Sequence, residues 1–332
     1  MARSYYIFKS GALRREQNTV YLENEEGKRP IPVEDIDALY IFGEITLNTK
    51  LLDFLDQKSV PIHFFDYYRN YSGSYWPRQP VQSGFLLVHQ VEHYTNAKKR
   101  LILAQEIVRA ATDNILRNLK YYKNRVTGLD ELIIKIEADQ QVIALAKDTL
   151  ELMSIEGRIR ERYYQSFNVI LNLEEPFGLF IKREKRPPTN PLNALISFGN
   201  SLLYAAVLSE IYRTQLNPTV SFLHEPGERR FSLSLDISEI FKPLLVDRTI
   251  FKLINNKMLS ESDFEQDLNY CYLKEGGRKT FVQQWEERLS KTIEHRKLRK
   301  HVSYRRLIRL ECYKLVKHLL GDEPYEGFRM WW

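Results

Sequence analysis

The sequence has 332 residues, of which 43% are hydrophobic and 28% are charged, which is ordinary for a globular protein with an apolar core. Residues 1–4 are not followed by the apolar run of a signal peptide, and the best membrane-span candidate, residues 194–212, is interrupted by polar residues, which predicts a buried helix. Two cysteines are too few for a disulfide framework or a cysteine-rich zinc site, so we expect a cytoplasmic protein that does not enter a membrane.

Positive charge is concentrated in the second part of the chain. The net charge at pH 7 is +6 and the isoelectric point is near 9.0. Residues 1–88 hold 10 Lys and Arg against 11 Asp and Glu, a net charge of −1, whereas residues 89–332 hold 39 against 32, a net charge of +7. This asymmetry favours a polyanion as the partner of the second part, although a solubility role would also account for a surplus of this size.

The first part of the chain has the pattern of short strands separated by polar turns. The strand candidates are rich in Tyr, Phe and branched aliphatic residues, and Thr49 is expected to cap a short amphipathic helix. The predicted strands cover residues 5–8, 20–22, 31–33, 38–42 and 60–65. We expect a small β-rich domain over residues 1–88 with an edge suited to self-association.

From about residue 89 the apolar period changes to that of helices. A long amphipathic helix is predicted over residues 97–123, and the Thr127-Gly128 pair ends it. One unusually long helix is predicted over residues 131–167, and further helical patterns cover residues 194–212, 244–255 and 280–320. The predicted fold class is therefore α+β, with a small N-terminal β-rich domain, residues 1–88, followed by a larger all-α domain, residues 89–332.

Glu156 occupies an unexpected position within the helical pattern of residues 131–167. At 100° per residue its side chain points along the apolar stripe of the helix and not toward the solvated face. A buried carboxylate needs a cation, a metal ion or strong hydrogen-bond donors, and Arg160, one turn further on, offers a purely structural ion pair. The apolar residues that define the stripe are Leu145, Leu152, Ile159 and Tyr163.

A second acidic pattern follows in residues 221–243. Asp236 and Glu239 share one face of a predicted helix and flank its buried stripe, as residues that line a cleft do. A capping box, with Asp236 as the N-cap and Glu239 three residues later, is the structural alternative. His224 lies fifteen residues before Glu239 and just ahead of a Pro-Gly turn. One imidazole with carboxylates favours Mg²⁺ or Mn²⁺ over Zn²⁺.

Basic residues that could contact a polyanion lie in three places. Arg229 and Arg230 follow His224 and suit a phosphate held near a metal ion. A Pro-rich basic loop at residues 181–191 contains Arg186. The third group is a run of cations within residues 280–320 that predicts a phosphate-contacting surface, although a charged helix face can also be merely solvated. Its strongest candidates are Arg296, Lys297, Arg299 and Lys300.

Three sequence blocks together resemble one known family. The blocks are S-I-E-G-R-I-R-E-R-Y-Y at residues 154–164, R-P-P-T-N-P-L-N-A-L-I-S-F-G-N-S-L-L at residues 186–203, and F-L-H-E-P-G-E-R-R-F-S-L-S-L-D-I-S-E-I-F-K-P at residues 222–243. In this order, and behind a small β-rich part, they resemble the first-numbered family of CRISPR-associated proteins. Its members are spacer-acquisition integrases that are also called CRISPR-associated endonucleases.

The resemblance implies roles for the residues that match. Glu156, His224 and Glu239 would be catalytic metal ligands, and Asp236 an adjacent acid that supports the ligands or replaces one of them. Family members often carry Asp where Glu239 stands, so the longer side chain alters the coordination geometry. The resemblance also implies a homodimer formed through the β-rich domain, a complex with the small second-numbered CRISPR-associated protein, and double-stranded DNA as substrate.

The function predicted from the sequence is a metal-dependent DNA integrase and endonuclease that uses Mg²⁺ or Mn²⁺. In this hypothesis a DNA 3′-hydroxyl attacks a target phosphodiester, and the basic surface holds the duplex mainly through its phosphates. Two alternatives remain open at this point. One is a non-catalytic DNA-binding scaffold in which the acids and the histidine are only packed and paired, and the other is a metal hydrolase for a small phosphoester.

Overall fold

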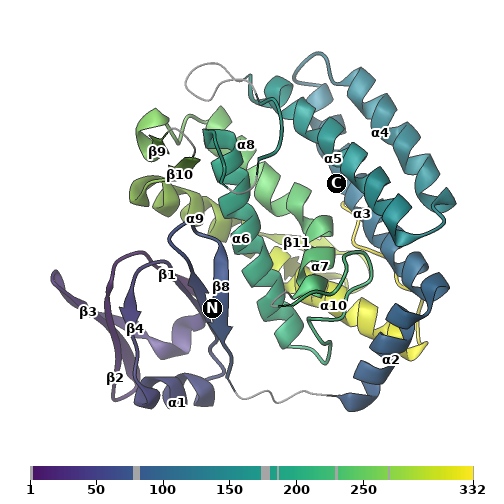
Figure 1. Cartoon of the computed structure of the whole chain (residues 1–332). Coiled ribbons are helices and arrows are strands. Elements are labelled where there is room, and N and C mark those ends of the chain that lie inside the picture. Colours follow the sequence, from purple (N-terminus) through teal and green to yellow (C-terminus); the bar gives the residue numbers. More distant parts are fainter. Residues whose placement is uncertain are drawn as a thin grey trace. The chain divides into compact units, whose positions relative to one another are not determined.

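The computed structural model divides the chain into two compact units, Met1–Pro80 and Val81–Trp332 (Figure 1). The predicted boundary at residue 88 falls inside helix α2, Gly84–Thr95, which starts where the Ser83 side chain accepts a hydrogen bond from the backbone of the first turn. The residues that the structure describes are 3–77, 83–172, 180–184, 187–228, 231–267 and 270–331.

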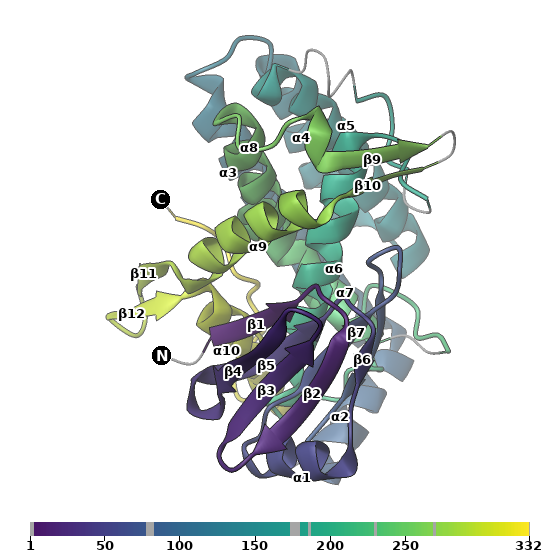
Figure 2. The same ribbon diagram turned by 90° about the vertical axis from the view of Figure 1, so that its left-hand side faces the viewer.

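The first unit contains two four-stranded sheets and one helix (Figure 2). In one sheet β1 pairs in parallel with β5, β5 pairs in parallel with β7, and β8 closes the sheet antiparallel to β7. In the other, β2, β3 and β4 form an antiparallel meander and the short β6 runs parallel to β2. The bounds are β1 Arg3–Ile7, β2 Gly11–Glu16, β3 Thr19–Asn24, β4 Gly27–Pro32, β5 Ile36–Ile41, β6 Ile45–Thr46, β7 Ile62–Phe65 and β8 Tyr71–Tyr75.

Helix α1, Thr49–Gln57, completes the apolar core of this unit. Its N-cap is Asn48, whose side chain accepts a hydrogen bond from the backbone N–H of Leu51, so the predicted cap at Thr49 is displaced by one residue. Leu51 and Leu55 pack with strand residues such as Leu13 and Leu39, all of which are fully buried. Each of the five predicted strands overlaps an observed one, whereas β2, β6 and β8 were not predicted. The buried aliphatic side chains of the strands and of α1 form one core.

The second unit is mainly helical, and its first helices differ from the prediction at one point. Helix α3 covers Ala97–Lys123, the predicted residues. The single helix predicted over residues 131–167 is wrong, because the chain forms α4, Asp130–Val142, and α5, Thr149–Leu171, with a break between them. Asp148 ends the break by accepting a hydrogen bond from the N–H of Glu151, and its N-cap conformation starts α5.

The break removes one residue from the apolar stripe that places Glu156. Leu145 lies before α5 and is 71% exposed, so it does not belong to the buried face of that helix. Leu152, Ile159 and Tyr163 are buried, as the period of α5 predicts. The position of Glu156 beside the buried stripe therefore rests on residues of α5 alone.

Helix α6, Pro191–Tyr212, is the central helix of the second unit. It is long and apolar enough to cross a membrane, yet 78% of its most apolar stretch is buried inside the protein, which is typical of a core helix and confirms the predicted buried helix. Gly199 allows close packing here, because a Cβ at this position would lie 2.6 Å from Cγ1 of Val246.

Helix α7, Ser232–Lys242, packs against both α3 and α6. A π-helical turn, Pro243–Asp247, follows it directly and leads into α8, Arg248–Asn255. The Asn114 side-chain amide of α3 donates to the carbonyl oxygens of Ile240, 3.0 Å away, and Phe328, 2.9 Å away. These two hydrogen bonds hold α7 and the C-terminal segment against α3.

The predicted α+β class, a β-rich part followed by a helical one, is confirmed, but the second unit is mainly α and not all-α. Two antiparallel hairpins interrupt it, β9–β10 and β11–β12. The helix predicted over residues 280–320 is therefore two helices with the β11–β12 hairpin between them. The bounds are β9 Phe264–Asp267, β10 Tyr270–Leu273, α9 Glu275–Ser290, β11 Thr292–His295, β12 Lys300–Ser303 and α10 Tyr304–Leu320.

Candidate metal and phosphate site

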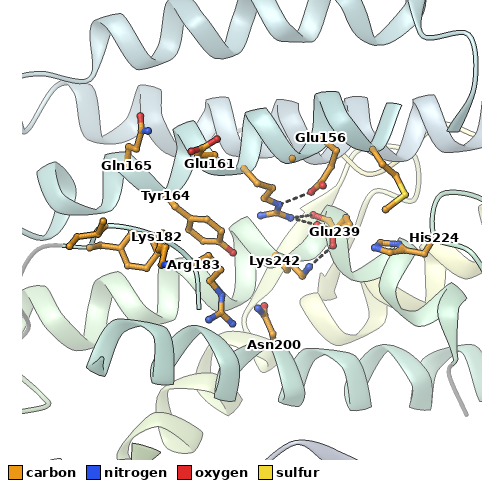
Figure 3. Close-up of a pocket in the computed structure, with 15 residues that line it drawn as sticks. Glu156, Glu161, Tyr164, Gln165, Lys182, Arg183, Asn200, His224, Glu239 and Lys242 are labelled. Carbon is orange, nitrogen blue, oxygen red and sulfur yellow. Dashed lines mark hydrogen bonds and ion pairs between the residues drawn. The ribbon is translucent and has the colours of Figure 1, made fainter. Parts of the chain in front are cut away.

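A pocket of about 570 Å³ lies within the second unit, between α5, α6 and α7 (Figure 3). Helix α5 contributes acidic, basic and aromatic side chains, α7 contributes an acid and a lysine, and the segment before α7 contributes a histidine. The predicted ligands Glu156, His224 and Glu239 all line this pocket, whereas Asp236 does not. The other polar and aromatic lining residues include Arg160, Glu161, Tyr164, Gln165, Lys182, Arg183, Asn200 and Lys242.

One arginine bridges the two acids of the pocket. Arg160 Nε donates to Glu156 Oε1 at 3.2 Å, and Arg160 Nη2 forms an ion pair with the Glu239 carboxylate. Lys242, three residues after Glu239 on α7, forms a second ion pair with that carboxylate. We call Glu156, Arg160, Glu239 and Lys242 the pocket cluster. The ion pair that the sequence offered as the structural alternative for Glu156 is thus present in the structure.

Burial differs between the members of the pocket cluster. The side chain of Glu156 is 23% exposed, whereas those of Glu239 and Arg160 are 6% and 10% exposed. Charges with so little water around them depend on one another, because an uncompensated buried charge costs several kcal/mol. Both acids thus share a cation that is itself shut away from water.

Asp236 anchors the segment that carries His224. Its carboxylate accepts hydrogen bonds from the backbone N–H groups of Phe222, Leu223 and His224 at 2.7 to 3.0 Å. It also pairs with His224 Nδ1 at 2.8 Å. The Asp236 side chain is fully buried and all of its acceptor capacity faces these donors. The predicted cleft position of Asp236 is therefore wrong.

The capping-box alternative for Asp236 is also wrong. Helix α7 begins at Ser232, and the residue at its N-cap, Phe231, has no side-chain capping bond. Asp236 thus lies within the helix, where its side chain reaches back to the segment before α7. Asp236 fixes the orientation of the His224 ring, because a histidine whose Nδ1 is held by a carboxylate presents Nε2 in one direction.

His224 presents its free ring nitrogen at the pocket. No donor or acceptor among the described residues pairs with Nε2, and the side chain is 18% exposed. Burial by itself lowers the pKa of His224, but the hydrogen bond that its Nδ1 donates to Asp236 and the negative charge of Asp236 raise the pKa of His224 above 6.5. The imidazole therefore gains a proton more readily than a free histidine unless a cation competes for Nε2.

The surroundings shift the pKa values of the two acids of the pocket cluster in opposite directions. Burial, followed by the negative charge of Glu239, raises the pKa of Glu156 above its ordinary value. Burial also opposes the ionisation of Glu239, but the positive charges of Lys242 and Arg160 outweigh it and hold the pKa of Glu239 well below its ordinary value. Glu239 is therefore a carboxylate at neutral pH, and Glu156 is the acid that lacks sufficient positive charge.

Across the described residues, no group of three or more His, Cys, Asp or Glu side chains is closed around one point. In the pocket this follows from the bridging arginine, which stands between the two carboxylates. The acids and the imidazole nevertheless line one pocket from three separate elements. The residues can thus meet around a cation only if the bridge opens.

With the geometry established, the chain can be compared with known proteins. The family model described as "CRISPR associated protein Cas1" matches residues 5–287. The chain belongs to the Cas1 family.

Relatives within the Cas1 family match over their full length. The chain is 54% identical over 331 residues to a protein named CRISPR-associated endonuclease Cas1 3 from Thermodesulfovibrio yellowstonii, covering 99% of this chain and 100% of that protein. It is 50% identical to CRISPR-associated endonuclease Cas1 from Clostridium perfringens, covering 100% of both. These matches confirm the resemblance seen in the three sequence blocks.

Solved structures share the fold. A Cas1 protein from Thermotoga maritima aligns with a TM-score of 0.88 at 41% identity, covering 99% of this chain and 100% of that one. A casposase bound to its integration product aligns at 0.85 with 21% identity, covering 98% and 92%. The chain of a Cas6-RT-Cas1–Cas2 complex aligns at 0.84 with 19% identity, covering 100% of this chain and 36% of that one. The last two matches concern the fold alone.

The predicted DNA contacts of this Cas1-family chain fall into two groups. Arg186, Arg229 and Arg230 lie outside the described residues. The other four cations are exposed and occupy the β11–β12 hairpin and its turn, not a helix as predicted. Their identities are Arg296, Lys297, Arg299 and Lys300, and none of them lines the pocket.

Several polar pocket residues are not among the predicted site residues, and three of them differ in the signal that their sequence carries. Lys242 carries a signal, since it stands three residues after Glu239 and therefore on the same face of α7. Asn200 belongs to the second sequence block, but a single polar residue in an apolar helix is as often structural as functional. Arg183 reaches its neighbour Asn193 across ten residues, at 2.9 Å, which no local period predicts.

Proposed function

We propose that this chain is a metal-dependent DNA integrase and endonuclease that inserts short DNA fragments into the CRISPR array. The observation that carries the proposal is the pocket, where Glu156, Glu239 and His224 converge from three elements beside basic side chains. The family also includes relatives that are named endonucleases, and the chain matches them over their full length. The cytoplasm is the proposed location, since the one helix within the described residues that is long and apolar enough to span a membrane is a core helix.

The donor set of the pocket fits a divalent cation. Glu156 and Glu239 offer carboxylate oxygens and His224 offers Nε2, which together form an oxygen-rich set of the kind that holds Mg²⁺ or Mn²⁺. Arg160 and Lys242 supply two positive charges to these acids in the structure, the charge that a divalent ion carries. When bound, such an ion stabilises negative charge on a phosphodiester and activates a hydroxyl.

Other residues in and beside the pocket orient the proposed ligands and balance their charge. Asp236 holds the imidazole of His224 through Nδ1 and directs Nε2 to the pocket. Lys242 and Arg183 line the pocket and can bind phosphate oxygens. In integration the 3′-hydroxyl oxygen of the fragment gives up its proton and bonds to phosphorus, the P–O3′ bond of the target strand breaks, and the target O3′ takes up a proton and leaves as a 3′-hydroxyl. In cleavage, water takes the place of the fragment.

Double-stranded DNA is the proposed substrate, and the β11–β12 hairpin is its proposed phosphate contact. Four exposed cations on one hairpin neutralise phosphates without reading the sequence. Changing Arg296, Lys297, Arg299 and Lys300 together to Gln should reduce the slope of log affinity against log salt by up to about 4. An unchanged slope would remove the hairpin from the DNA surface.

Two protein partners complete the proposal. The β-rich unit would form the homodimer, and the small second-numbered CRISPR-associated protein would join it in the integration complex. The family resemblance supports both partners. The unit Met1–Pro80 has its own apolar core, which suits a separate dimerisation domain. Analytical ultracentrifugation of the chain with and without residues 1–80 would test the dimer.

The decisive assay is strand transfer. Labelled short duplexes and a plasmid carrying a CRISPR repeat are incubated with the protein, with and without Mn²⁺ and the partner protein. The proposal expects metal-dependent joining at the repeat borders, which His224→Ala abolishes while DNA binding survives. The control is Asp139→Asn, a buried acid of α4 that pairs with two arginines away from the pocket.

Other outcomes of this assay point to the alternatives. Binding of DNA without any metal-dependent chemistry would support a non-catalytic scaffold. Turnover of a model diester without stimulation by DNA would support a small-phosphoester hydrolase. Normal joining by the His224→Ala protein would show that the pocket is not the active site.

A further inference from the structure

A second buried carboxylate lies beyond the pocket lining. Asp247, the last residue of the π-helical turn Pro243–Asp247, is 2% exposed. The Tyr163 hydroxyl lies close enough to lower the pKa of this carboxyl, against the larger effect of burial. Its Oδ2 has no hydrogen-bond partner among the described residues. A buried carboxylate oxygen without a donor is costly and calls for an explanation.

The partner that this oxygen lacks is available on Arg160. The guanidinium of Arg160 uses Nε for Glu156 and Nη2 for Glu239, while its Nη1 has no partner. Of the charged groups around Asp247, Arg160 has the largest effect on its ionisation, so the two side chains are electrostatic neighbours that do not bond directly. The structure thus holds one unused donor and one unused acceptor of opposite charge in the same buried region.

A divalent cation and the arginine compete for the same oxygens. Glu156 and Glu239 are the acids proposed to hold the ion, and both are bound by Arg160. Moving a buried guanidinium away from its carboxylates without a new acceptor costs several kcal/mol, which would be subtracted from the binding of the ion. An alternative acceptor near the arginine removes most of this cost.

We propose that Arg160 has two positions, one bridging Glu156 and Glu239 in the metal-free protein, and one paired with Asp247 when a divalent cation binds the two acids. Asp247 is then a positioning residue for metal binding and touches neither metal nor DNA. This inference rests on the proposed function, because it takes Glu156 and Glu239 as metal ligands. Burial raises the pKa of Asp247 to about 7, and a fully paired Arg160 would lower that pKa.

Lys242 shows why only the arginine needs such an acceptor. Both cations neutralise Glu239, but the Lys242 side chain is 19% exposed and Arg160 is 10% exposed. A lysine at the pocket mouth can turn its ammonium to water or to a DNA phosphate when displaced. The guanidinium of Arg160 is enclosed by α5 and α7, and apart from Glu156 and Glu239, Asp247 is the one other carboxyl among the groups that affect its ionisation, beside the Tyr164 hydroxyl.

The inference is tested by the affinity for Mn²⁺, measured by isothermal titration calorimetry and by the EPR signal of free Mn²⁺. Asp247→Asn should weaken Mn²⁺ binding about tenfold, because the displaced arginine then meets a neutral amide. Arg160→Gln should strengthen it, because the competing cation is gone. In the Arg160→Gln protein, adding Asp247→Asn should change nothing further. Asp139→Asn is the matched control, with a buried acid paired to arginines of the same helix α5.

The outcomes separate the inference from the function on which it rests. If Mn²⁺ binds the wild type but Asp247→Asn binds it equally well, or if Arg160→Gln weakens binding, the two-position arginine is wrong and the proposed function stands. If the wild type does not bind Mn²⁺, or if Glu156→Gln and His224→Ala bind it normally, the proposed metal site itself fails. Should Asp247→Asn not fold, as judged by circular dichroism, the Arg160→Gln comparison still decides.

Discussion

Helix α5 takes part in two acid–arginine clusters, and their difference separates a reactive site from a structural one. In the pocket cluster, two carboxylates share one buried arginine and draw a lysine from α7. In the other, the single carboxylate of Asp139 receives Arg158 at 3.4 Å and an ion pair from Arg162, both partly exposed. The first cluster pairs two acids with two cations, whereas the second gives one acid two cations.

This difference has a physical consequence for ligands. An acid that already receives two arginines offers little to a metal ion, and its exposed cations are hydrated. Two acids that share one cation keep oxygens that a divalent ion can use, provided the arginine can move. The same residue types on opposite faces of one helix therefore serve stability on one face and, by our proposal, catalysis on the other.

The largest effect is expected for Glu156→Gln. Removing this carboxylate should reduce metal-dependent strand transfer by about 10³-fold or more, as loss of a catalytic group does in other enzymes. Because burial already raises the pKa of Glu156, a neutral amide should cost little stability. Asp139→Asn should show the reverse, with about 1–3 kcal/mol of lost stability and normal strand transfer. Activity assays and thermal melts of both proteins decide between the two roles.

A smaller but still large effect is expected for Asp236→Asn. The amide keeps one acceptor oxygen in place of a carboxylate that serves three backbone N–H groups and His224 Nδ1. We expect a loss of stability of about 2–4 kcal/mol and a 10- to 100-fold loss of metal affinity. Ser238→Ala on the same helix, which removes a local bond to the Ser234 carbonyl, is the control. Equal metal affinity in both proteins would contradict the positioning role of Asp236.

Acidic pH should weaken metal binding through His224. The pKa of His224 is raised above 6.5, so the protonated form gains stability on folding, and that gain is lost as the pH rises through the raised pKa. Metal binding needs the neutral imidazole and should therefore strengthen as the pH rises, by at most about tenfold per pH unit below the pKa. In Asp236→Asn the midpoint should move to lower pH. Calorimetry between about pH 5.5 and 8.5 measures the profile, and an identical midpoint in both proteins would contradict it.

The smallest effect is expected for Lys242→Met. Its ammonium competes with a divalent ion for Glu239, but it is partly exposed and can leave the carboxylate easily. Metal affinity should rise by no more than a few-fold, because Arg160, the more deeply buried cation, still competes for Glu239. A fall in Mn²⁺ affinity would show that Lys242 supports the ligands and does not compete with them.

The sequence predicted the ligand-bearing elements better than their contacts. The periods of α3 and α6 located both helices, and the period of α5 brought Glu156 beside the buried stripe. The break after α4 was missed, because apolar residues continue the pattern through Ile143 and Ala146. Local periodicity does not register a cap such as Asp148 when the residues around it remain helix-forming.

Two further misses have long-range causes. The β11–β12 hairpin is rich in Lys and Arg, which favour helices, so strand pairing overrode the local preference of residues 292–303. Asp236 was placed at a cleft because its helical face is shared with Glu239, whereas backbone donors at Phe222 to His224 draw its carboxylate into the core. These backbone donors are brought to Asp236 by the tertiary fold, so no periodic pattern in the sequence predicts the contact.

The most direct measurement is an anomalous difference map from a crystal soaked in MnCl₂, collected near the manganese absorption edge. We predict one strong peak within coordination distance, about 2.0–2.3 Å, of the Glu156 and Glu239 carboxylates and His224 Nε2, with Arg160 no longer between the acids. A map with no peak in the pocket, or with Arg160 still bridging both acids beside a peak elsewhere, would contradict the metal site.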